Sequence, residues 1–376
     1  GAVNATDPNL DVPKVNRYSF GLDHIVSSDS SFLDGWNVKF DMIYSDMIDQ
    51  IDFLDLSLHQ TGTAPDGRPP YSQVNALAAG CNATFNGPRM GYSGVTDECW
   101  GGNQDVFMTN RPGDGGYTFT TSLQAAKAFD LGEWDVNVVA GYSYNESHIG
   151  NPGVSFTAAE NFRAVATDDV GLVPIGRSLR NKPHNLVLSA QFSRAIFGDL
   201  NTSIGVFLNR QAGRDISAVF MGGPYAGAIG DTGGRARNLL YVPTDENDPL
   251  VTFADTFDTA GFFHWVDREG LKRGAIQEKG GLSEHWQTDL DIRIQQEIPW
   301  FGDRNAMVYL DLENLTNLLS DSSGSKMYIN TTDIAAAVGT VTADMDATTN
   351  TYVYQSFSEP TMWPDVWDSV WRLQVG

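Results

Sequence analysis

Residues 286–298 read WQTDLDIRIQQEI, and this stretch decides the fold class. One set of alternate positions is mainly apolar and consists of Trp286, Thr288, Leu290, Ile292, Ile294 and Ile298. The opposite set is polar or ionic and consists of Gln287, Asp289, Asp291, Arg293, Gln295 and Glu297. Successive side chains of a β-strand point to opposite sides, whereas a helix would mix these two sets. The stretch is therefore predicted to be a β-strand with one apolar and one ionic face.

The same alternation recurs along the whole chain. The clear cases are 36–45, 134–145, 186–193 and 306–313, and the weaker cases are 15–26, 117–129, 201–217 and 366–376. Together they predict about nine strands, most of them near the ~9–11 residues with which a tilted strand crosses a bilayer. No run approaches the ~18 uninterrupted apolar residues of a transmembrane helix. We therefore expect an all-β fold in which any membrane crossing is made by strands.

The connections between these strands alternate in length. Short turns are expected at 27–35, 130–133, 198–200 and 299–304, and long polar loops at roughly 63–115, 150–182, 218–284 and 320–365. Tight periplasmic turns and long extracellular loops are typical of a transmembrane antiparallel β-barrel. Aromatic residues recur near the expected strand ends, where interface girdles would lie: Trp36, Tyr44, Trp134, Tyr144, Trp286, Trp300, Phe301 and Trp371. In this topology the first and last strands run downward, which puts the C-terminus in the periplasm.

The ionic strand faces are expected to line a hydrated interior. They carry Asp41, Asp289, Asp291, Arg293, Glu297, Asp311, Glu313 and Arg372. On a lipid face near the midplane each charge would cost up to ~2–4 kcal/mol, so the opposite orientation is disfavoured.

Two stretches resemble a known family. Residues 289–319 read DLDIRIQQEIPWFGDRNAMVYLDLENLTNLL, and residues 370–376 read VWRLQVG. Together they resemble the C-terminal barrel of TonB-dependent outer-membrane receptors, most of all the Oar-like, OmpA-related group. Asn314 and Asn317 match the Asn residues that end the upward strand in that pattern. The resemblance implies that residues 1–376 are about the last nine strands of a ~22-stranded barrel, with a plug domain absent from this sequence. We also expect the natural sequence to continue a few residues past Gly376, to a terminal aromatic residue.

The resemblance also implies a function and a location. It implies active uptake or movement of a large solute across the outer membrane of a Gram-negative cell, with the loops extracellular. The implied partners are outer-membrane lipid and lipopolysaccharide, the remaining strands and plug of the same receptor, and the TonB complex, which acts through a plug and TonB box outside this chain. Two alternatives stay open: a passive porin or structural barrel, and a soluble all-β carbohydrate-binding module. Detergent dependence separates the soluble module from the barrels, and the upstream gene sequence separates the two barrels.

Charge and motifs exclude several other functions. The chain has 24 Lys plus Arg against 47 Asp plus Glu, a formal net charge of −23, which argues against nucleic-acid binding. Residues 90–94 do not complete the G-x-S-x-G pattern of a nucleophile elbow, and no other catalytic signature occurs. The six histidines are scattered without metal-ligand spacing, and solvated charge explains the acidic stretches 245–248 and 344–346 better than calcium does. We therefore expect no enzyme activity, no metal site and no cofactor.

The loops hold the remaining candidates. Cys81 and Cys99 are the only cysteines, and a disulfide formed in an oxidising compartment is favoured over two unrelated thiols. Residues 157–160 fit a capping box, which predicts a short helix near 157–166. The ligand-binding candidates are aromatic residues of the kind that stack on sugars or peptides, with ordinary loop packing as the alternative: Tyr92, Trp100 and Phe107 near the disulfide, and Phe262, Phe263 and Trp265.

Overall fold

The computed structural model describes residues 3–221, 236–301, 304–320, 324–329 and 337–376. The protein is 52% strand and 8% helix, which confirms the predicted all-β fold. Nine strands pair with their neighbours in chain order, all antiparallel. They are β2 (Lys14–Ile25), β3 (Asn37–Ile48), β10 (Gly116–Leu131), β11 (Trp134–Ile149), β13 (His184–Phe197), β14 (Leu200–Gln211), β20 (Gln287–Pro299), β21 (Asn305–Glu313) and β26 (Arg372–Val375). We call this the nine-strand sheet; the two-residue strand β12 (Gly176–Arg177) pairs with the end of β11.

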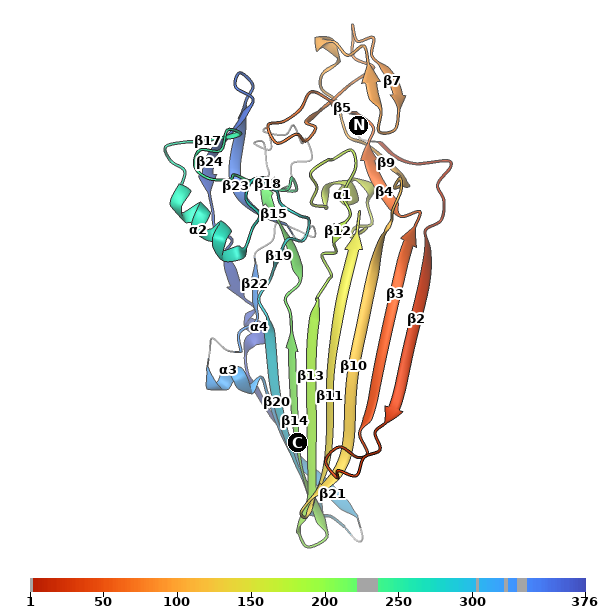
Figure 1. Ribbon diagram of the computed structural model, residues 1–376, viewed down its shortest axis with the longest axis vertical. Helices are drawn as coiled ribbons and strands as arrows, with labels where there is room; N and C mark the ends of the chain where they lie inside the picture. The colour runs from red at the N-terminus through yellow and green to blue at the C-terminus, as the bar shows by residue number, and fades with distance from the viewer. Residues whose placement is uncertain (1–2, 222–235, 302–303, 321–323, 330–336) are drawn as a thin grey trace.

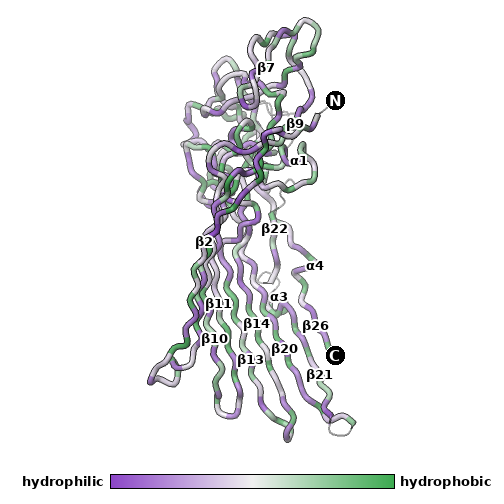
Figure 2. Tube along the Cα trace, turned by 90° about the vertical axis from the view of Figure 1, so that its right-hand side faces the viewer, coloured by the Kyte–Doolittle hydropathy of each residue, from purple (hydrophilic) through white to green (hydrophobic). Residues whose placement is uncertain are grey.

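Register extends the alternation of single strands across the sheet. Phe192 of β13 lies opposite Ile204 of β14, which lies opposite Ile294 of β20. One position along, Gln191 lies opposite Gly205, which lies opposite Arg293. Directly opposed residues share a face, so the sheet has one apolar face and one polar face. Figure 2 shows the strands side by side, with hydrophobic and hydrophilic residues alternating along them.

The apolar face of the nine-strand sheet is open. Phe20 is 56% exposed, Leu123 is 50% exposed and Leu373 is 54% exposed. The three clusters of buried hydrophobic residues found in the described part of the chain contain no residue of this sheet. The sheet is therefore held together by its hydrogen-bonded ladder and cross-strand pairs, without a core of its own.

All the long connections leave the sheet at the same end (Figure 1). We call them the first (49–115), second (150–183), third (212–286) and fourth (314–371) long loops, and together with β1 (Val3–Thr6) they form the head. Short turns join the strands at the opposite end. The first, third and fourth long loops are longer than expected from the sequence, because β3 ends at Ile48, β14 leaves the sheet at Gln211 and β26 begins only at Arg372.

The segment before the last strand corrects a prediction. Residues 366–369, expected to be strand, form the short helix α4 (Val366–Ser369). The carboxylate of Asp365 accepts hydrogen bonds from the backbone N–H groups of Trp367 and Asp368, which caps the first turn of this helix. Trp371 still lies at the head end of the sheet, next to the first residue of β26.

The third and fourth long loops fold into one mixed sheet. Its order is β17 (Val251–Phe253), β24 (Thr351–Phe357), β23 (Ala337–Asp346), β15 (Asp215–Phe220) and β19 (Leu282–Ser283). β15 pairs in parallel with β23, and β17 pairs in parallel with β24, so strands of the two loops interleave. Helix α2 (Thr259–Glu269) packs on this sheet through Phe262 and Trp265, whose rings lie 5.3 and 5.5 Å from that of Phe357.

The first and second long loops form the other half of the head. A three-stranded sheet joins β1, β9 (Asp105–Asn110) and β4 (Ile51–Asp55). Against it packs α1 (Ala158–Arg163), whose N-cap Thr157 accepts a hydrogen bond from Glu160 N, so the predicted helix and its cap are confirmed. Phe162 of α1 joins Phe53 and Val106 in a buried cluster.

The remaining elements are short. They are β5 (Leu58–Gln60), β6 (Tyr71–Gln73), β7 (Thr84–Gly87), β8 (Gly91–Ser93), the 3-10 helix η1 (Asp97–Cys99), β16 (Tyr241–Val242), β18 (Ala275–Ile276), α3 (Leu315–Leu319), β22 (Met327–Ile329) and β25 (Met362–Pro364). None of the helices in the described ranges has the length and apolar character needed to cross a membrane.

Candidate functional site

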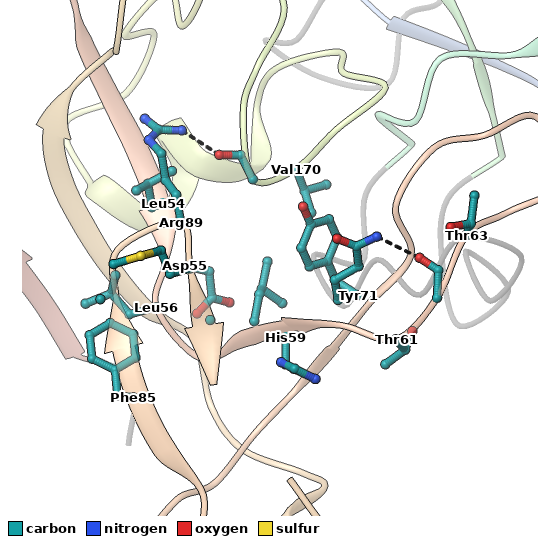
Figure 3. A pocket seen from close by; sticks show the side chains of 17 residues that line it. Leu54, Asp55, Leu56, His59, Thr61, Thr63, Tyr71, Phe85, Arg89 and Val170 are labelled. Carbon is teal, nitrogen blue, oxygen red and sulfur yellow. Dashed lines mark hydrogen bonds between the residues drawn. The ribbon is translucent and has the colours of Figure 1, made fainter. Parts of the chain in front are cut away.

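A pocket of about 600 Å³ opens between the first and second long loops (Figure 3). The first long loop supplies residues 54–56 and 58–63, Tyr71 and part of the β7–β8 hairpin, and the second supplies Val170 and Gly171. The volume falls within the ~300–1,000 Å³ typical of sites for small ligands. Because two loops rooted on different strands form its walls, a ligand there would contact both.

Arg89 ties the two walls together. Its Nη2 donates to Asp52 Oδ2 at 2.8 Å, and its Nη1 donates to the carbonyl oxygen of Gly171 at 2.5 Å. The side chain of Asp52 is only 1% exposed, so this ion pair compensates a buried carboxylate. Arg89 also has φ 65°, a left-handed conformation that is uncommon for a residue with a side chain. The hairpin thus places the guanidinium at the seam between the loops.

A second tie lies deeper in the pocket. The hydroxyl of Tyr71 donates to Asp169 Oδ1 at 2.9 Å, and Gly171 N donates to the same oxygen at 2.7 Å. Burial, together with the charge of Asp169, raises the pKa of Tyr71 well above its usual range, which keeps the phenol protonated and able to donate. The carboxylate of Asp55 is likewise occupied. Its Oδ1 accepts from the backbone and hydroxyl of Ser57 and from Asp105 N, and its Oδ2 accepts from Gln73 Nε2 at 3.4 Å.

Several polar groups of the wall have spare hydrogen-bonding capacity. Within the described residues, the side chains of His59 and Thr63 make no hydrogen bond or ion pair, and the ring of His59 lies 6.1 Å from that of Trp100. Gln60 uses its Nε2 on the carbonyl oxygen of Gly62, at 2.8 Å, and keeps its side-chain oxygen. The pocket therefore combines fixed, compensated charges with uncommitted polar groups.

An adjoining, mostly apolar pocket of about 360 Å³ lies behind Phe85. Phe85 lines both pockets, and its ring lies 5.3 Å from that of Tyr92 in the second. Ala5, Leu56, Ala76, Asp105 and Val106 complete this lining. Burial raises the pKa of Tyr92, so its phenol is also in the protonated state.

The first three aromatic candidates all lie in the first long loop, but in different surroundings. Tyr92 lines the apolar pocket, and Trp100, 41% exposed, stands beside the His59 of the larger pocket. Phe107 lies in the middle strand β9, opposite Ala5 and Leu54, and lines neither pocket. Cys81 and Cys99 form the favoured disulfide, with Cα atoms 4.8 Å apart.

The other three aromatic candidates lie elsewhere. Phe262, Phe263 and Trp265 are 0%, 9% and 1% exposed, within the aromatic cluster between α2 and the five-stranded sheet. Their side chains are used in packing, which was the alternative weighed for them. Spacing in the sequence did not separate them from the exposed candidates, because an aromatic-rich loop helix and a ligand-contacting loop have the same composition.

None of the residues that line the larger pocket was among the ligand-binding candidates from the sequence, including Gln60, Tyr71 and Arg89. The sequence of residues 85–94 did not predict the β7–β8 hairpin. Nothing in its spacing indicated that Arg89 would reach Gly171 in another loop.

The acidic stretches of the loops stabilise turns. Asp248 accepts hydrogen bonds from Thr244 N, Leu250 N and the hydroxyl of Tyr241. Asp346 accepts from Thr348 N and Thr349 N at the turn between β23 and β24. In the part of the chain that the structure describes, no three His, Cys, Asp or Glu side chains are grouped so that they could hold a metal ion.

Comparisons with protein-family models, with curated proteins and with solved structures found no match for this chain. The nine-strand sheet and the pocket in the head are therefore the features that bear on function.

Proposed function

We propose that this chain is the C-terminal part of the transmembrane β-barrel of an outer-membrane receptor of the TonB-dependent type, which moves a large solute across the membrane. The observation that supports this most is the open apolar face of the nine-strand sheet. In water such a face would cost roughly 25 cal/mol for each Å² of apolar surface left exposed. Contact with lipid removes this cost, and the polar face then lines the interior.

The positions of the aromatic side chains support the proposal, because their spacing matches the thickness of a membrane. Two sets of neighbouring rings lie at the head end of the sheet, the first made of Tyr18, Tyr44, Tyr117 and His148 and the second of Tyr144, His184 and Trp286. Trp36, Trp134 and Trp300 lie at the turn end. Along β11, residues 134 and 144 are ten positions apart, which at ~3.3 Å per residue is ~33 Å. A strand tilt of ~40° reduces this to ~25 Å, the height of the apolar band of outer-membrane barrels.

Charges on the opposite face have partners of opposite sign. Within the sheet, Arg293 lies 3.2 Å from Asp311 and Arg372 lies 3.7 Å from Glu313, while Asp289 lies 3.1 Å from Lys326 of the fourth long loop. Such pairs are solvated in a water-filled or plugged interior, whereas on the lipid side each charge would be penalised.

The two edge strands, β2 and β26, leave rows of backbone groups without partners in the described structure. Lipid offers no hydrogen bonds to such edges. The proposal therefore requires the remaining strands and a plug from the same polypeptide. It places the head outside the cell, in contact with lipopolysaccharide, and the short turns at the opposite end of the sheet in the periplasm.

A pair of cysteine variants of the full-length protein tests the orientation. Ala347→Cys lies in the exposed turn of the head, and Asp199→Cys is its matched control in a turn at the opposite end. In intact cells a membrane-impermeant maleimide should label only the head variant, and it should label both once the outer membrane is permeabilised. Equal labelling in intact cells, or a protein recovered in the water-soluble fraction, would contradict the proposal.

Measurement of ion conductance distinguishes the proposed receptor from a passive porin. A receptor closed by a plug should show no steady conductance in a planar lipid bilayer, whereas a porin should show open channels. A plug and a TonB box in the upstream gene support the receptor, and their absence removes that part of the proposal.

A further inference from the structure

We propose that the pocket between the first and second long loops binds a neutral saccharide. This inference rests on the proposed function in one respect, because a solute outside the cell meets the head first. Three properties of the wall favour this ligand class: its charges, its uncommitted polar groups and its apolar surfaces.

The charges of the wall exclude an ionic ligand. The guanidinium of Arg89 is engaged by Asp52, and the carboxylate of Asp55 accepts three hydrogen bonds from Ser57 and Asp105. A bound phosphate, carboxylate or ammonium group would have to break these pairs or remain uncompensated, which is costly in a partly desolvated site. The formal net charge of −23 further disfavours anions.

The uncommitted groups suit a hydroxyl-rich ligand. The hydroxyl of Thr63 and the imidazole of His59 can each donate and accept, and the side-chain oxygen of Gln60 accepts. Sugar hydroxyls have the same double capacity and surround a ring, so they meet polar groups from several directions. A peptide presents a fixed alternation of donors and acceptors along a line, which is matched by a strand edge rather than by separate side chains.

The apolar parts of the wall suit the C–H faces of a sugar ring. Phe85, Leu58, Met90 and Val170 line the pocket together with the polar groups, and Phe85 and Met90 are 42% and 68% exposed. Figure 3 shows Phe85 and Asp55 on one side of the pocket and Thr63 on the other, with His59 and Tyr71 between them. A neutral saccharide therefore satisfies the polar and the apolar surfaces at the same time.

The test uses the full-length protein in detergent on an array of neutral and anionic glycans, followed by calorimetry with the tightest neutral oligosaccharide and with a tri-alanine peptide. The double variant His59→Ala/Thr63→Val removes two polar groups that make no other hydrogen bond in the described structure. We expect binding of the neutral oligosaccharide to weaken roughly 10-fold or more. The control Thr348→Val, in the β23–β24 turn outside the pocket, should bind as the unmodified protein does.

Each other outcome overturns the inference. Equal binding by the double variant and the control places the site elsewhere, and preference for anionic glycans or for the peptide contradicts the assigned ligand class. If protein that passes the cysteine-labelling test binds no glycan, this inference is overturned and the proposed function still stands. Failure of the labelling test removes the proposed function separately, because it is measured without a ligand.

Discussion

Asn314 shows how one residue can organise a loop. It follows β21 with φ 53°, a left-handed conformation that Asn tolerates better than most residues, and it caps α3 by accepting from Asn317 N. Its Nδ2 donates to the carbonyl oxygens of Gly324 and Ser369, at 3.0 and 2.7 Å. Asn314 thereby joins the beginning of the fourth long loop to its end. The sequence motif marked this residue, and the structure gives it a physical role.

Replacing Asn314 should loosen the fourth long loop. We expect Asn314→Ala to lower the free energy of unfolding by about 2–3 kcal/mol, because it loses the cap and two buried hydrogen bonds and strains the backbone. Asn314→Gly loses the same cap and hydrogen bonds but adopts the left-handed conformation without strain. It should therefore recover part of the lost free energy of unfolding. Urea unfolding of the full-length protein in detergent measures both, and an alanine variant as stable as the glycine variant would contradict the conformational part.

Lys279 is a buried cation between loops. Its Nζ donates to the carbonyl oxygens of Ile149, at 2.8 Å, and Gly150, at the head end of β11. Burial and the neighbouring Arg111 lower the pKa of Lys279 to about 7, against a small opposing effect of Asp52. In the unfolded chain the ordinary pKa near 10.5 applies.

The stability of the head should therefore depend on pH through Lys279. Between pH 7 and 10.5 the unfolded state binds more protons at this residue than the folded state does, so its contribution to stability rises with pH. In Lys279→Met this dependence is absent. We expect the stability of the unmodified protein, relative to the variant, to increase from pH 7 to pH 10 in urea unfolding; a constant difference would refute the lowered pKa.

Among the elements, the segment of the first long loop that the disulfide closes contains little regular structure. The Cys81–Cys99 bond spans a sequence separation of 18 residues around the short β7–β8 hairpin. Closing a loop of this size stabilises by roughly 3 kcal/mol in the chain-entropy view.

Removing this disulfide should have a local effect. In Cys81→Ser/Cys99→Ser we expect faster proteolysis between β6 and β9, while the β23–β24 hairpin is cleaved at an unchanged rate. Mass spectrometry of limited digests measures both segments. Equal acceleration in the two would show that the disulfide stabilises the whole head.

The sequence predicted the strands of the nine-strand sheet well because each has one apolar and one polar face, which a period of two reveals. The same period of two did not predict the strands of the head. β15 is buried along all six of its residues, and its partners β19 and β23 lie in distant parts of the chain. A short strand buried on both faces has no alternation to detect. The sequence did not predict the pocket either, because Arg89 and Gly171 meet only through tertiary folding.

At the scale of the whole molecule, the two faces of the sheet should differ in their tolerance of charge. Leu188 lies on the apolar face of β13, and Gln191, three positions along, lies on the polar face. Leu188→Arg should lower the assembled fraction of the full-length protein in membranes, since Arg on a lipid face costs up to ~2–4 kcal/mol. Gln191→Arg is the matched control and should assemble normally. Equal assembly of both variants would contradict a lipid-facing apolar side.

The interleaved sheet of the head sets an order of folding. Ser217 of β15 pairs with Ala337 of β23, and Val251 of β17 pairs with Tyr352 of β24. Contacts between such distant residues form slowly, because a long loop must close before they stabilise anything. The first and second long loops can close while the third still waits for the fourth, which lies near the end of the described chain. During that interval β15 and β17 have open edges. We therefore expect this half of the head to need a chaperone most at the stage before the fourth long loop has paired with it.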